Sequence, residues 1–226
     1  MTSDLPYFDK PSPWSSHSLI AAYLKKLPLQ SRVLDIGTAS GTLARMCQGH
    51  SLHLFGVEPN PDWAQIAAPL YERIYVGSIQ DAEDDFLAGY DLVVLGDVLE
   101  HLPVPEVVLQ RLVGLQSSGT TFIISVPNIA NLWIRLSLLV GKFDYADRGI
   151  LDRTHLRFFT RKTLLEMLKR SGLEIISIQV TPIPLELVSR FFLSMPGRWI
   201  HASFARLTSL LPALLGYQFV LKARKP

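Results

Sequence analysis

The sequence predicts an α/β fold in which helices cover both faces of a doubly wound, mostly parallel sheet. Short apolar runs alternate with helix-like segments from Arg32 to about residue 126. The runs are continuously apolar, which is typical of strands that are buried on both sides. At 226 residues the chain has the length of one ordinary domain, so we expect residues 1–226 to form a single domain.

Seven segments have the composition of strands. In chain order they are RVLDIG (32–37), LHLFGVE (52–58), RIYVG (73–77), DLVVLG (91–96), TTFIISVP (120–127), LEIISIQV (173–180) and YQFVLKAR (217–224).

Helices are predicted between these strands. They cover TLARMCQ (42–48), PDWAQIAAPL (61–70), VPEVVLQRLVGL (104–115) and RKTLLEMLKRSG (161–172). Pro61 suits a first helical turn, Thr160 is a candidate N-cap, and Gly172 follows directly after the end of its helix.

Composition excludes several classes of protein. The net charge of +2 is too small to indicate a nucleic-acid partner. The single cysteine, Cys47, rules out an internal disulfide framework and fits a reducing compartment. The N-terminus lacks the pattern of a secretory signal, and no apolar run approaches the roughly 18 residues of a spanning helix. We therefore expect a cytoplasmic protein.

The turn after the first strand indicates which nucleotide the sheet binds. This strand leads into the sequence VLDIGTASGTLA. A dinucleotide turn has the pattern G-x-G-x-x-G, but Ala39 and Thr42 replace the second and third glycines here. The pattern D-x-G-x-A-x-G fits instead, set by Asp35, Gly37, Ala39 and Gly41. An acidic group at the end of the strand favours a cationic ligand over a diphosphate.

The second strand ends in Glu58, within the sequence FGVEPNP. A carboxylate at this position can accept hydrogen bonds from both ribose hydroxyls of an adenosine. The two turns together predict a pocket for S-adenosylmethionine, whose ammonium and sulfonium groups are both positively charged.

Four segments occur in the order and spacing of one known superfamily: VLDIGTASGTLA, GVEPNP, DLVVLGDVLEHL and TTFIISVPN. From about Arg32 to Arg170 the chain resembles the class I S-adenosylmethionine-dependent methyltransferases. VLEHL (98–102) is similar to the branch that contains the ubiquinone-biosynthesis O-methyltransferases. DRTHLRFFT (152–160) is similar to bacterial methyltransferases often associated with surface-polysaccharide and natural-product pathways.

The resemblance implies a Rossmann-like sheet of seven strands in the order 3-2-1-4-5-7-6, with an antiparallel strand at its C-terminal end. It also implies which residues surround the cofactor: Asp35, Gly37, Thr38, Ala39 and Gly41 at the methionine part and ribose, Glu58 at the ribose, Pro59 and Asn60 beside the adenine, Ser78 and Ile79 against the adenine, and Gly96 and Asp97 near the methionine part.

Two positions depart from the superfamily pattern. The family has glycine where Ala39 stands, and we expect the alanine to be tolerated through a negative φ angle. An acidic residue often follows the third strand, where this chain reads VGSIQD and offers Ser78. In the N-terminal segment, Trp14 or His17 could close over the cofactor.

Two of the six histidines are candidate catalytic residues. His101 follows the fourth strand, and His155 lies in DRTHLRFF. A hydroxyl acceptor must lose its proton, and a neutral histidine can accept it near neutral pH. Asp152 could orient His155, while Arg157 could neutralise an anionic substrate or pair with Asp152. The alternatives are that His101 packs the start of the next helix and that His155 only holds its loop.

No metal site is predicted, because one cysteine and scattered acidic residues form no recognisable ligand set. Two segments are longer than a minimal doubly wound domain requires, and we expect both to cap the pocket: residues 127–159 and 183–215. In the first cap, Trp133 and Tyr145 are candidate substrate contacts, together with Arg157.

The second cap contains an apolar helical stripe with Arg198 and Arg206 beside it. The interpretation we favour is a lid or homodimer face that packs this stripe against protein. The alternative is a basic amphipathic helix that lies on an anionic bilayer. A membrane role would place the protein at the inner membrane surface.

The sequence therefore predicts an S-adenosylmethionine-dependent methyltransferase. We expect O-methylation of a small-molecule, sugar-linked or lipid-linked acceptor. N- or C-methylation, a non-catalytic S-adenosylmethionine-binding module and a nicotinamide-dependent oxidoreductase are the alternatives.

Overall fold

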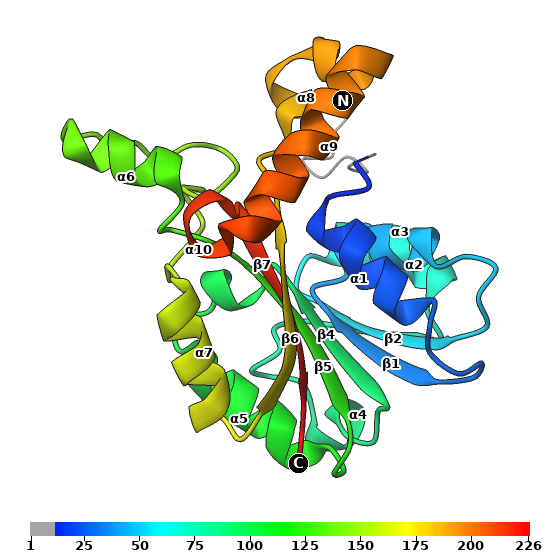
Figure 1. Ribbon diagram of the computed structural model, residues 1–226. Coiled ribbons are helices and arrows are strands. Elements are labelled where there is room, and N and C mark those ends of the chain that lie inside the picture. The colour runs from blue at the N-terminus through cyan, green and yellow to red at the C-terminus, as the bar shows by residue number, and fades with distance from the viewer. Residues whose placement is uncertain (1–11) are drawn as a thin grey trace.

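The computed structural model describes residues 12–226 and contains a seven-stranded sheet with helices on both faces (Figure 1). The strand order β3-β2-β1-β4-β5-β7-β6 confirms the predicted order. β7 pairs antiparallel with both β5 and β6, and the remaining pairs are parallel. The strands are β1 Arg32–Ile36, β2 His53–Glu58, β3 Arg73–Val76, β4 Leu92–Gly96, β5 Thr121–Pro127, β6 Glu174–Thr181 and β7 Gln218–Arg224.

One face of the sheet packs against the early helices of the chain. These are α1 Ser16–Leu24, α2 Thr42–Met46, α3 Pro61–Ala67 and the short 3-10 helix η1 Ala68–Leu70. Ile20 and Leu24 of α1 are fully buried against Val33 and Val94 of the central strands. Ala67 of α3 joins a small cluster with α2.

The opposite face packs against a second set of helices. These are α4 Asp84–Leu87, the 3-10 helix η2 Leu99–His101, α5 Pro105–Leu115 and α7 Arg161–Arg170. Leu34 and Val93 point to this face and meet Leu109 and Leu168 in the main core. Neighbouring residues of each central strand thus point to opposite cores, as continuously apolar strands require.

The predicted start and end signals of α7 are present. Thr160 is its N-cap and exchanges hydrogen bonds with Thr163 in a capping box. Gly172 follows the helix with a φ of +87°, a conformation that glycine adopts without strain.

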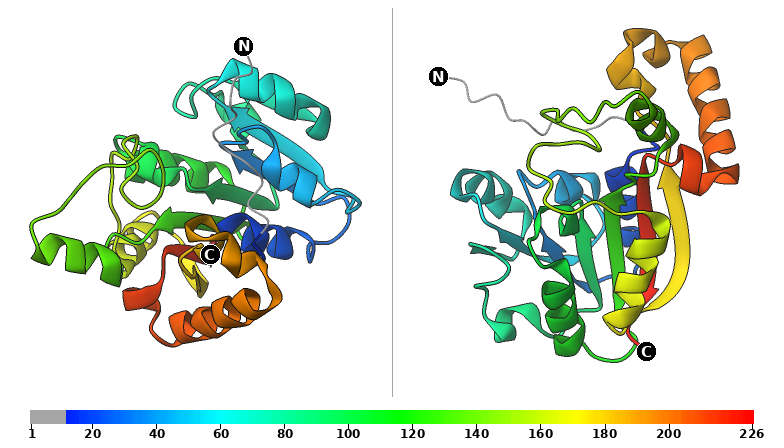
Figure 2. Two further views of the ribbon diagram at one scale, coloured as in Figure 1. Left: turned by 90° about the horizontal axis from the view of Figure 1, so that it is seen from above. Right: turned by 90° about the vertical axis from the view of Figure 1, so that its left-hand side faces the viewer.

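Two arms extend from the end of the sheet where the parallel strands finish (Figures 1 and 2). The α6 arm, residues 128–143, contains α6 Leu132–Leu139 and lies between β5 and α7. The α9 arm, residues 182–215, lies between β6 and β7. It contains α8 Leu185–Val188, the 3-10 helix η3 Arg190–Leu193, α9 Met195–Leu210 and α10 Pro212–Leu215.

Within residues 12–226, no helix has both the length and the apolar character needed to cross a bilayer. The predicted absence of a secretory signal concerns residues that largely precede this range.

Candidate active site

A pocket of about 590 Å³ opens where β1, β2 and β4 end. Small-molecule sites are usually roughly 300–1,000 Å³, so this pocket can hold a nucleoside together with part of an acceptor. Its position at the carboxyl ends of parallel strands is where doubly wound folds bind ligands. Ten of the residues singled out from the sequence line it: His17, Gly37, Ala39, Glu58, Pro59, Ser78, Ile79, Gly96, Asp97 and His101.

Other predicted residues lie next to the pocket without lining it. Thr38 and Gly41 belong to the first turn but are not among the residues that line the pocket. Asn60 is the N-cap of α3, and its side chain accepts from the backbone N–H groups of Asp62 and Trp63. Trp14 lines a separate small pocket beside the α9 arm.

The pocket also contains polar and aromatic residues that were not assigned to the cofactor from the sequence. They are Thr42, Trp63, Gln80, Asp147, Asp152 and Thr154. Trp63 and Gln80 follow the predicted motifs within a few positions, so their proximity could have been predicted. Asp147 comes from the long cap segment, and nothing in its local sequence signals where that loop lies.

Three alternate residues of the first turn have a left-handed backbone conformation. The φ angles are +78° at Gly37, +46° at Ala39 and +87° at Gly41. A Cβ atom on Gly37 would lie 2.9 Å from Val98, and one on Gly41 would lie 2.8 Å from Leu70. The expectation of a negative φ at Ala39 is therefore wrong, because the turn retains the backbone shape that glycine would adopt there.

Glu58 holds this turn in place. Its Oε2 accepts the backbone N–H of Ala39 at 2.7 Å, and its Oε1 accepts that of Asn60 at 2.9 Å. Burial raises the pKa of the Glu58 carboxyl, although both hydrogen bonds act in the opposite direction. Each carboxylate oxygen retains a second lone pair, with which Glu58 can accept ribose hydroxyls.

Asp35 does not face the pocket. Its carboxyl is buried and accepts a hydrogen bond of 2.6 Å from the hydroxyl of Tyr71. Burial raises the pKa of Asp35 to about 7, which the Tyr71 hydrogen bond opposes and the neighbouring Glu58 reinforces. The structure thus places Asp35 as a support behind the turn instead of against the cofactor ammonium.

Asp97 is the carboxylate that lines the pocket beside Gly96. Its oxygens accept from the hydroxyls of Ser125 at 2.7 Å and Ser16 at 3.2 Å. Its φ of +59° turns the chain out of β4, in a conformation that aspartate tolerates better than most residues. An acceptor-only group held in this way suits the positively charged methionine end of the cofactor.

The two candidate catalytic histidines contact each other, but only His101 lines the pocket, and His155 is not among the lining residues. The ring centroids of His101 and His155 are 4.9 Å apart, with the rings inclined at 69°. Nδ1 of His101 lies 3.2 Å from the carbonyl oxygen of Thr154, and Nδ1 of His155 lies 3.1 Å from that of Ile150. Burial lowers the pKa of His155, a shift that the Ile150 contact opposes and His101 reinforces.

Backbone hydrogen bonds fasten the loop of His155 to η2. The carbonyl oxygen of Glu100 accepts the N–H groups of Leu156 at 2.7 Å and Arg157 at 3.0 Å. The guanidinium of Arg157 donates to the carbonyl of Pro103, through Nε at 2.8 Å and through Nη2. Arg157 thus binds backbone in this structure, and the predicted pairing with Asp152 is absent among the described contacts.

Asp152 accepts instead from the N–H and hydroxyl of Thr154, at 2.8 and 2.6 Å. Burial raises the pKa of Asp152, but these hydrogen bonds and the nearby imidazoles outweigh that effect and lower it overall. The group that orients His155 is therefore the Ile150 carbonyl, and not Asp152 as the sequence suggested.

The predicted aromatic substrate residues lie outside the pocket. Trp133 is 68% exposed and Tyr145 is 50% exposed. Phe143 contacts both Tyr145 and Phe158 edge to face, with ring centroids 5.6 and 5.9 Å apart. This aromatic chain connects the α6 arm to the loop that carries His155.

The pocket residues fit S-adenosylmethionine. Glu58 at the end of β2 offers carboxylate oxygens that can accept hydroxyl groups, and Asp97 offers negative charge at the end of β4. The turn around Ala39 lacks the spacing of a diphosphate loop. This geometry and the sheet order define the class I methyltransferase fold.

Comparison with known proteins agrees with this geometry. Residues 13–178 match a methyltransferase-domain family. The chain therefore belongs to the methyltransferase-domain family, and it is an S-adenosylmethionine-dependent methyltransferase. Among curated protein sequences, none matches the chain significantly.

Solved structures share the fold at low sequence identity. A SAM-dependent methyltransferase from Archaeoglobus fulgidus is 19% identical, with a TM-score of 0.61, over 92% of this chain and 94% of that one. Magnesium protoporphyrin IX methyltransferase from Synechocystis, with bound SAH, is 16% identical, with a TM-score of 0.61, over 93% and 82%. A possible histamine N-methyltransferase from Thermotoga maritima is 16% identical, with a TM-score of 0.60, over 94% and 90%. At these identities the likeness concerns the fold and leaves the acceptor open.

Proposed function

We propose that the protein methylates a hydroxyl oxygen of a lipid-linked acceptor while its two arms rest on an anionic membrane surface, at the inner face of the membrane. The observation that carries this proposal is the inverted character of α9, whose apolar side faces solvent.

The buried side of α9 is formed by small and polar residues: Gly197, His201, Ala205 and Thr208. His201 lies 3.3 Å from Glu186 in a buried ion-pair geometry that braces the arm. The exposed side carries large apolar groups: Trp199 at 68%, Ile200 at 52% and Leu210 at 77% exposure. Of the stripe noticed in the sequence, Ile200, Leu207 and Leu211 are 46–52% exposed and Phe204 is partly buried, so the stripe is only partly packed against this chain.

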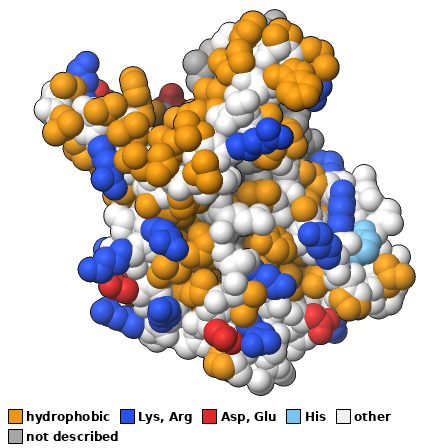
Figure 3. All heavy atoms as spheres, viewed as in Figure 1, with side chains coloured by type: hydrophobic (Ala, Val, Ile, Leu, Met, Phe, Trp, Pro, Cys, Tyr) orange, Lys and Arg blue, Asp and Glu red, His pale blue; other side chains and the backbone are white. Residues whose placement is uncertain are grey.

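The α6 arm repeats this arrangement. Only Ile134 of α6 is buried, whereas Trp133, Leu139 and Val140 are 68–80% exposed. Figure 3 shows hydrophobic side chains covering both arms. Apolar groups gathered in this way on an exposed surface indicate an interaction site. Exposed tryptophans suit the boundary between water and lipid.

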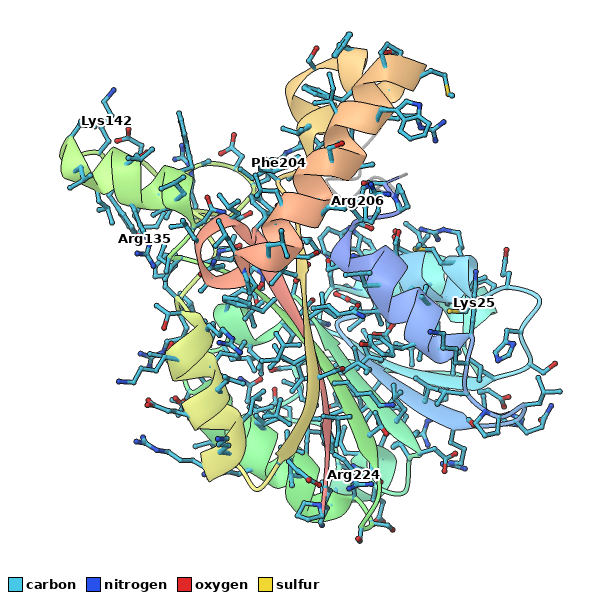
Figure 4. All side chains as sticks on the ribbon, viewed as in Figure 1. Lys25, Arg135, Lys142, Phe204, Arg206 and Arg224 are labelled. Carbon is cyan, nitrogen blue, oxygen red and sulfur yellow. The ribbon has the colours of Figure 1, made fainter. Side chains whose placement is uncertain are left out.

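The charge of the arms favours an anionic bilayer. Arg135 and Lys142 are exposed on the α6 arm, and Arg198 and Arg206 are exposed on α9. Figure 4 shows Lys142 at the tip of the α6 arm. Residues 128–143 contain no acidic residue, and the α9 arm contains one, Glu186, which is buried against His201. Each cation near an anionic surface contributes about 1 kcal/mol, so these four contribute roughly 4 kcal/mol.

A second copy of the chain fits this surface less well. A two-fold dimer places the same patch against itself, which would bring like charges from both arms together. A protein partner would need its own acidic and apolar surface, whereas an anionic bilayer offers both features at once.

The chemistry follows from the position of the pocket. S-adenosylmethionine supplies an electrophilic methyl group with a good leaving group, so positioning provides much of the catalysis. The histidine pair offers nitrogen lone pairs at the acceptor side. These lone pairs favour an oxygen acceptor, whose proton must leave during transfer.

Vesicle flotation tests the membrane part of the proposal. The whole chain is mixed with vesicles of phosphatidylglycerol or of phosphatidylcholine alone. We expect flotation with the anionic vesicles and much weaker binding to the neutral ones. The double variant Lys142→Gln/Arg198→Gln should weaken binding roughly 30-fold, since two charges contribute about 2 kcal/mol.

Val107→Ala is the matched control, because Val107 is 60% exposed on α5 and far from both arms. It should float like the parent chain. Recovery of the parent chain in the soluble fraction with both vesicle types would refute the membrane assignment. A stable dimer that is lost in Trp133→Ala/Trp199→Ala would assign the arms to a second copy.

A further inference from the structure

Three side chains that can bind a metal converge beside the pocket, and one of them, His101, lines it. Glu100 and His101 come from η2, and His155 comes from the loop fastened to η2. Each offers one ligand atom, and these atoms all lie within 4.8 Å of one another. Glu100 is 1% exposed, so its carboxylate is withdrawn from water. Buried carboxylates occur as metal ligands.

Hydrogen bonds fix the tautomer of both imidazoles. A carbonyl oxygen can only accept, so Nδ1 of His101 must donate to Thr154 and Nδ1 of His155 must donate to Ile150. In a neutral ring this leaves the lone pair on Nε2. Histidines that bind metals show this arrangement, in which the second nitrogen donates to a carbonyl or carboxylate and sets the ring orientation.

The surroundings are negatively charged on the pocket side. Asp97, Asp147 and Asp152 line the pocket together with His101, and Asp147 is paired with Arg153 at 3.2 Å. Asp152 lies close enough to act electrostatically on both imidazoles. Two arginines of this loop are engaged elsewhere, since Arg157 donates to the carbonyl of Pro103 and Arg153 pairs with Asp147. A cation would therefore meet two imidazole nitrogens near carboxylates.

We propose that Glu100, His101 and His155 bind a divalent transition-metal cation of the Zn²⁺ type, with open coordination positions toward the pocket. Two imidazoles and one carboxylate are a recurring ligand set of catalytic metal sites. Bonds of about 2.1 Å in tetrahedral geometry separate ligand atoms by about 3.4 Å, so each pair must approach by at most about 1.4 Å. Small side-chain rotations suffice for this.

The inference rests on the proposed function for its role. An acceptor hydroxyl bound to the cation would lose its proton more readily, because a bound cation lowers the pKa of a coordinated oxygen. The histidines would then hold the cation, and the proton of the hydroxyl would pass to solvent water in the pocket. The sequence predicted no metal because His155 lies far along the chain from the adjacent Glu100 and His101.

Metal binding itself provides the test. The full chain is stripped with a chelator and titrated with Co²⁺ and Zn²⁺, and calorimetry is combined with the visible absorption of bound Co²⁺. We expect one cation per chain. His155→Ala, His101→Ala and Glu100→Gln should each weaken binding by more than the roughly 10–100-fold that loss of an outer partner causes.

His53→Ala is the matched control. His53 begins β2, at the end of that strand away from the pocket, and pairs with Glu72. This variant should bind the metal like the parent chain. Binding of S-adenosylmethionine is measured in parallel on every variant, and its retention shows that the fold is intact. Retained cofactor binding with no Co²⁺ spectrum, or Zn²⁺ binding unchanged in all three ligand variants, would overturn the metal site alone. Loss of cofactor binding in the parent chain would instead overturn the proposed function.

Discussion

Replacing Asp35 by asparagine should flatten the pH dependence of stability. The buried Asp35 carboxyl has a pKa of about 7, compared with an ordinary value of 3.8. Folding therefore favours its protonated form. The stabilisation is complete below the unfolded pKa and is lost as the pH rises through about 7.

The magnitude follows from these two pKa values. Between about pH 5 and about pH 8, protonation linkage at this single group removes about 2.5 kcal/mol from the free energy of unfolding. Asparagine cannot ionise, but it can still accept the hydrogen bond from Tyr71. Between about pH 5 and about pH 8, the free energy of unfolding should therefore fall by about 2.5 kcal/mol less in the Asp35→Asn variant than in the parent chain.

Urea unfolding at several pH values, followed by far-UV circular dichroism, measures the effect. Asp85→Asn, which alters an exposed carboxyl on α4, is the control and should keep the parent pH dependence. The reasoning fails if Asp35→Asn and the parent chain lose the same free energy of unfolding between about pH 5 and about pH 8.

Three further predictions concern the turn and the α9 arm. Glu58→Gln leaves one backbone N–H of the turn without an acceptor, so it should destabilise the protein by about 1–3 kcal/mol. In calorimetry it should also weaken S-adenosylmethionine binding at least about 10-fold. Unchanged affinity would contradict the ribose role of Glu58. Gly41→Ala combines a left-handed φ with a Cβ atom 2.8 Å from Leu70. Thermal unfolding should therefore show that the free energy of unfolding falls by about 2 kcal/mol or more. A variant as stable as the parent chain would mean that the turn can relax. Gly197→Ala would place a Cβ atom 2.2 Å from the carbonyl oxygen of Phe191. Amide hydrogen exchange should therefore become faster in the α9 arm, while cofactor binding persists. Amides that stay protected throughout the arm would disprove the predicted loosening.

The sequence predicted the sheet well because its strands are buried on both faces. Continuous apolar runs identify such strands without knowledge of their neighbours. Thr160 marked the start of α7 correctly, since capping depends on local hydrogen bonds. The tight turn after β1 was also predicted correctly, because glycine spacing reflects local backbone shape.

The sequence could not supply contacts between distant segments. Asp35 was assigned to the cofactor because it ends β1, but Tyr71 binds its carboxyl on the far side of the turn. His101 and His155 were chosen separately, and only the loop fastened to Glu100 brings them together. Periodicity located the apolar stripe of α9, but periodicity does not tell whether a stripe faces protein or solvent.

The α9 arm leaves and re-enters the sheet at one point. Thr181, the last residue of β6, pairs directly with Gln218, the first residue of β7. The backbone N–H of Tyr217 donates to the carbonyl of Thr181 at 2.8 Å and closes the base of the arm. The whole excursion is thus an insertion into a β-hairpin, which a short turn could replace without altering the strand order. Such a module could be exchanged or remodelled during evolution, changing where the enzyme works while its methyl-donor pocket stays the same.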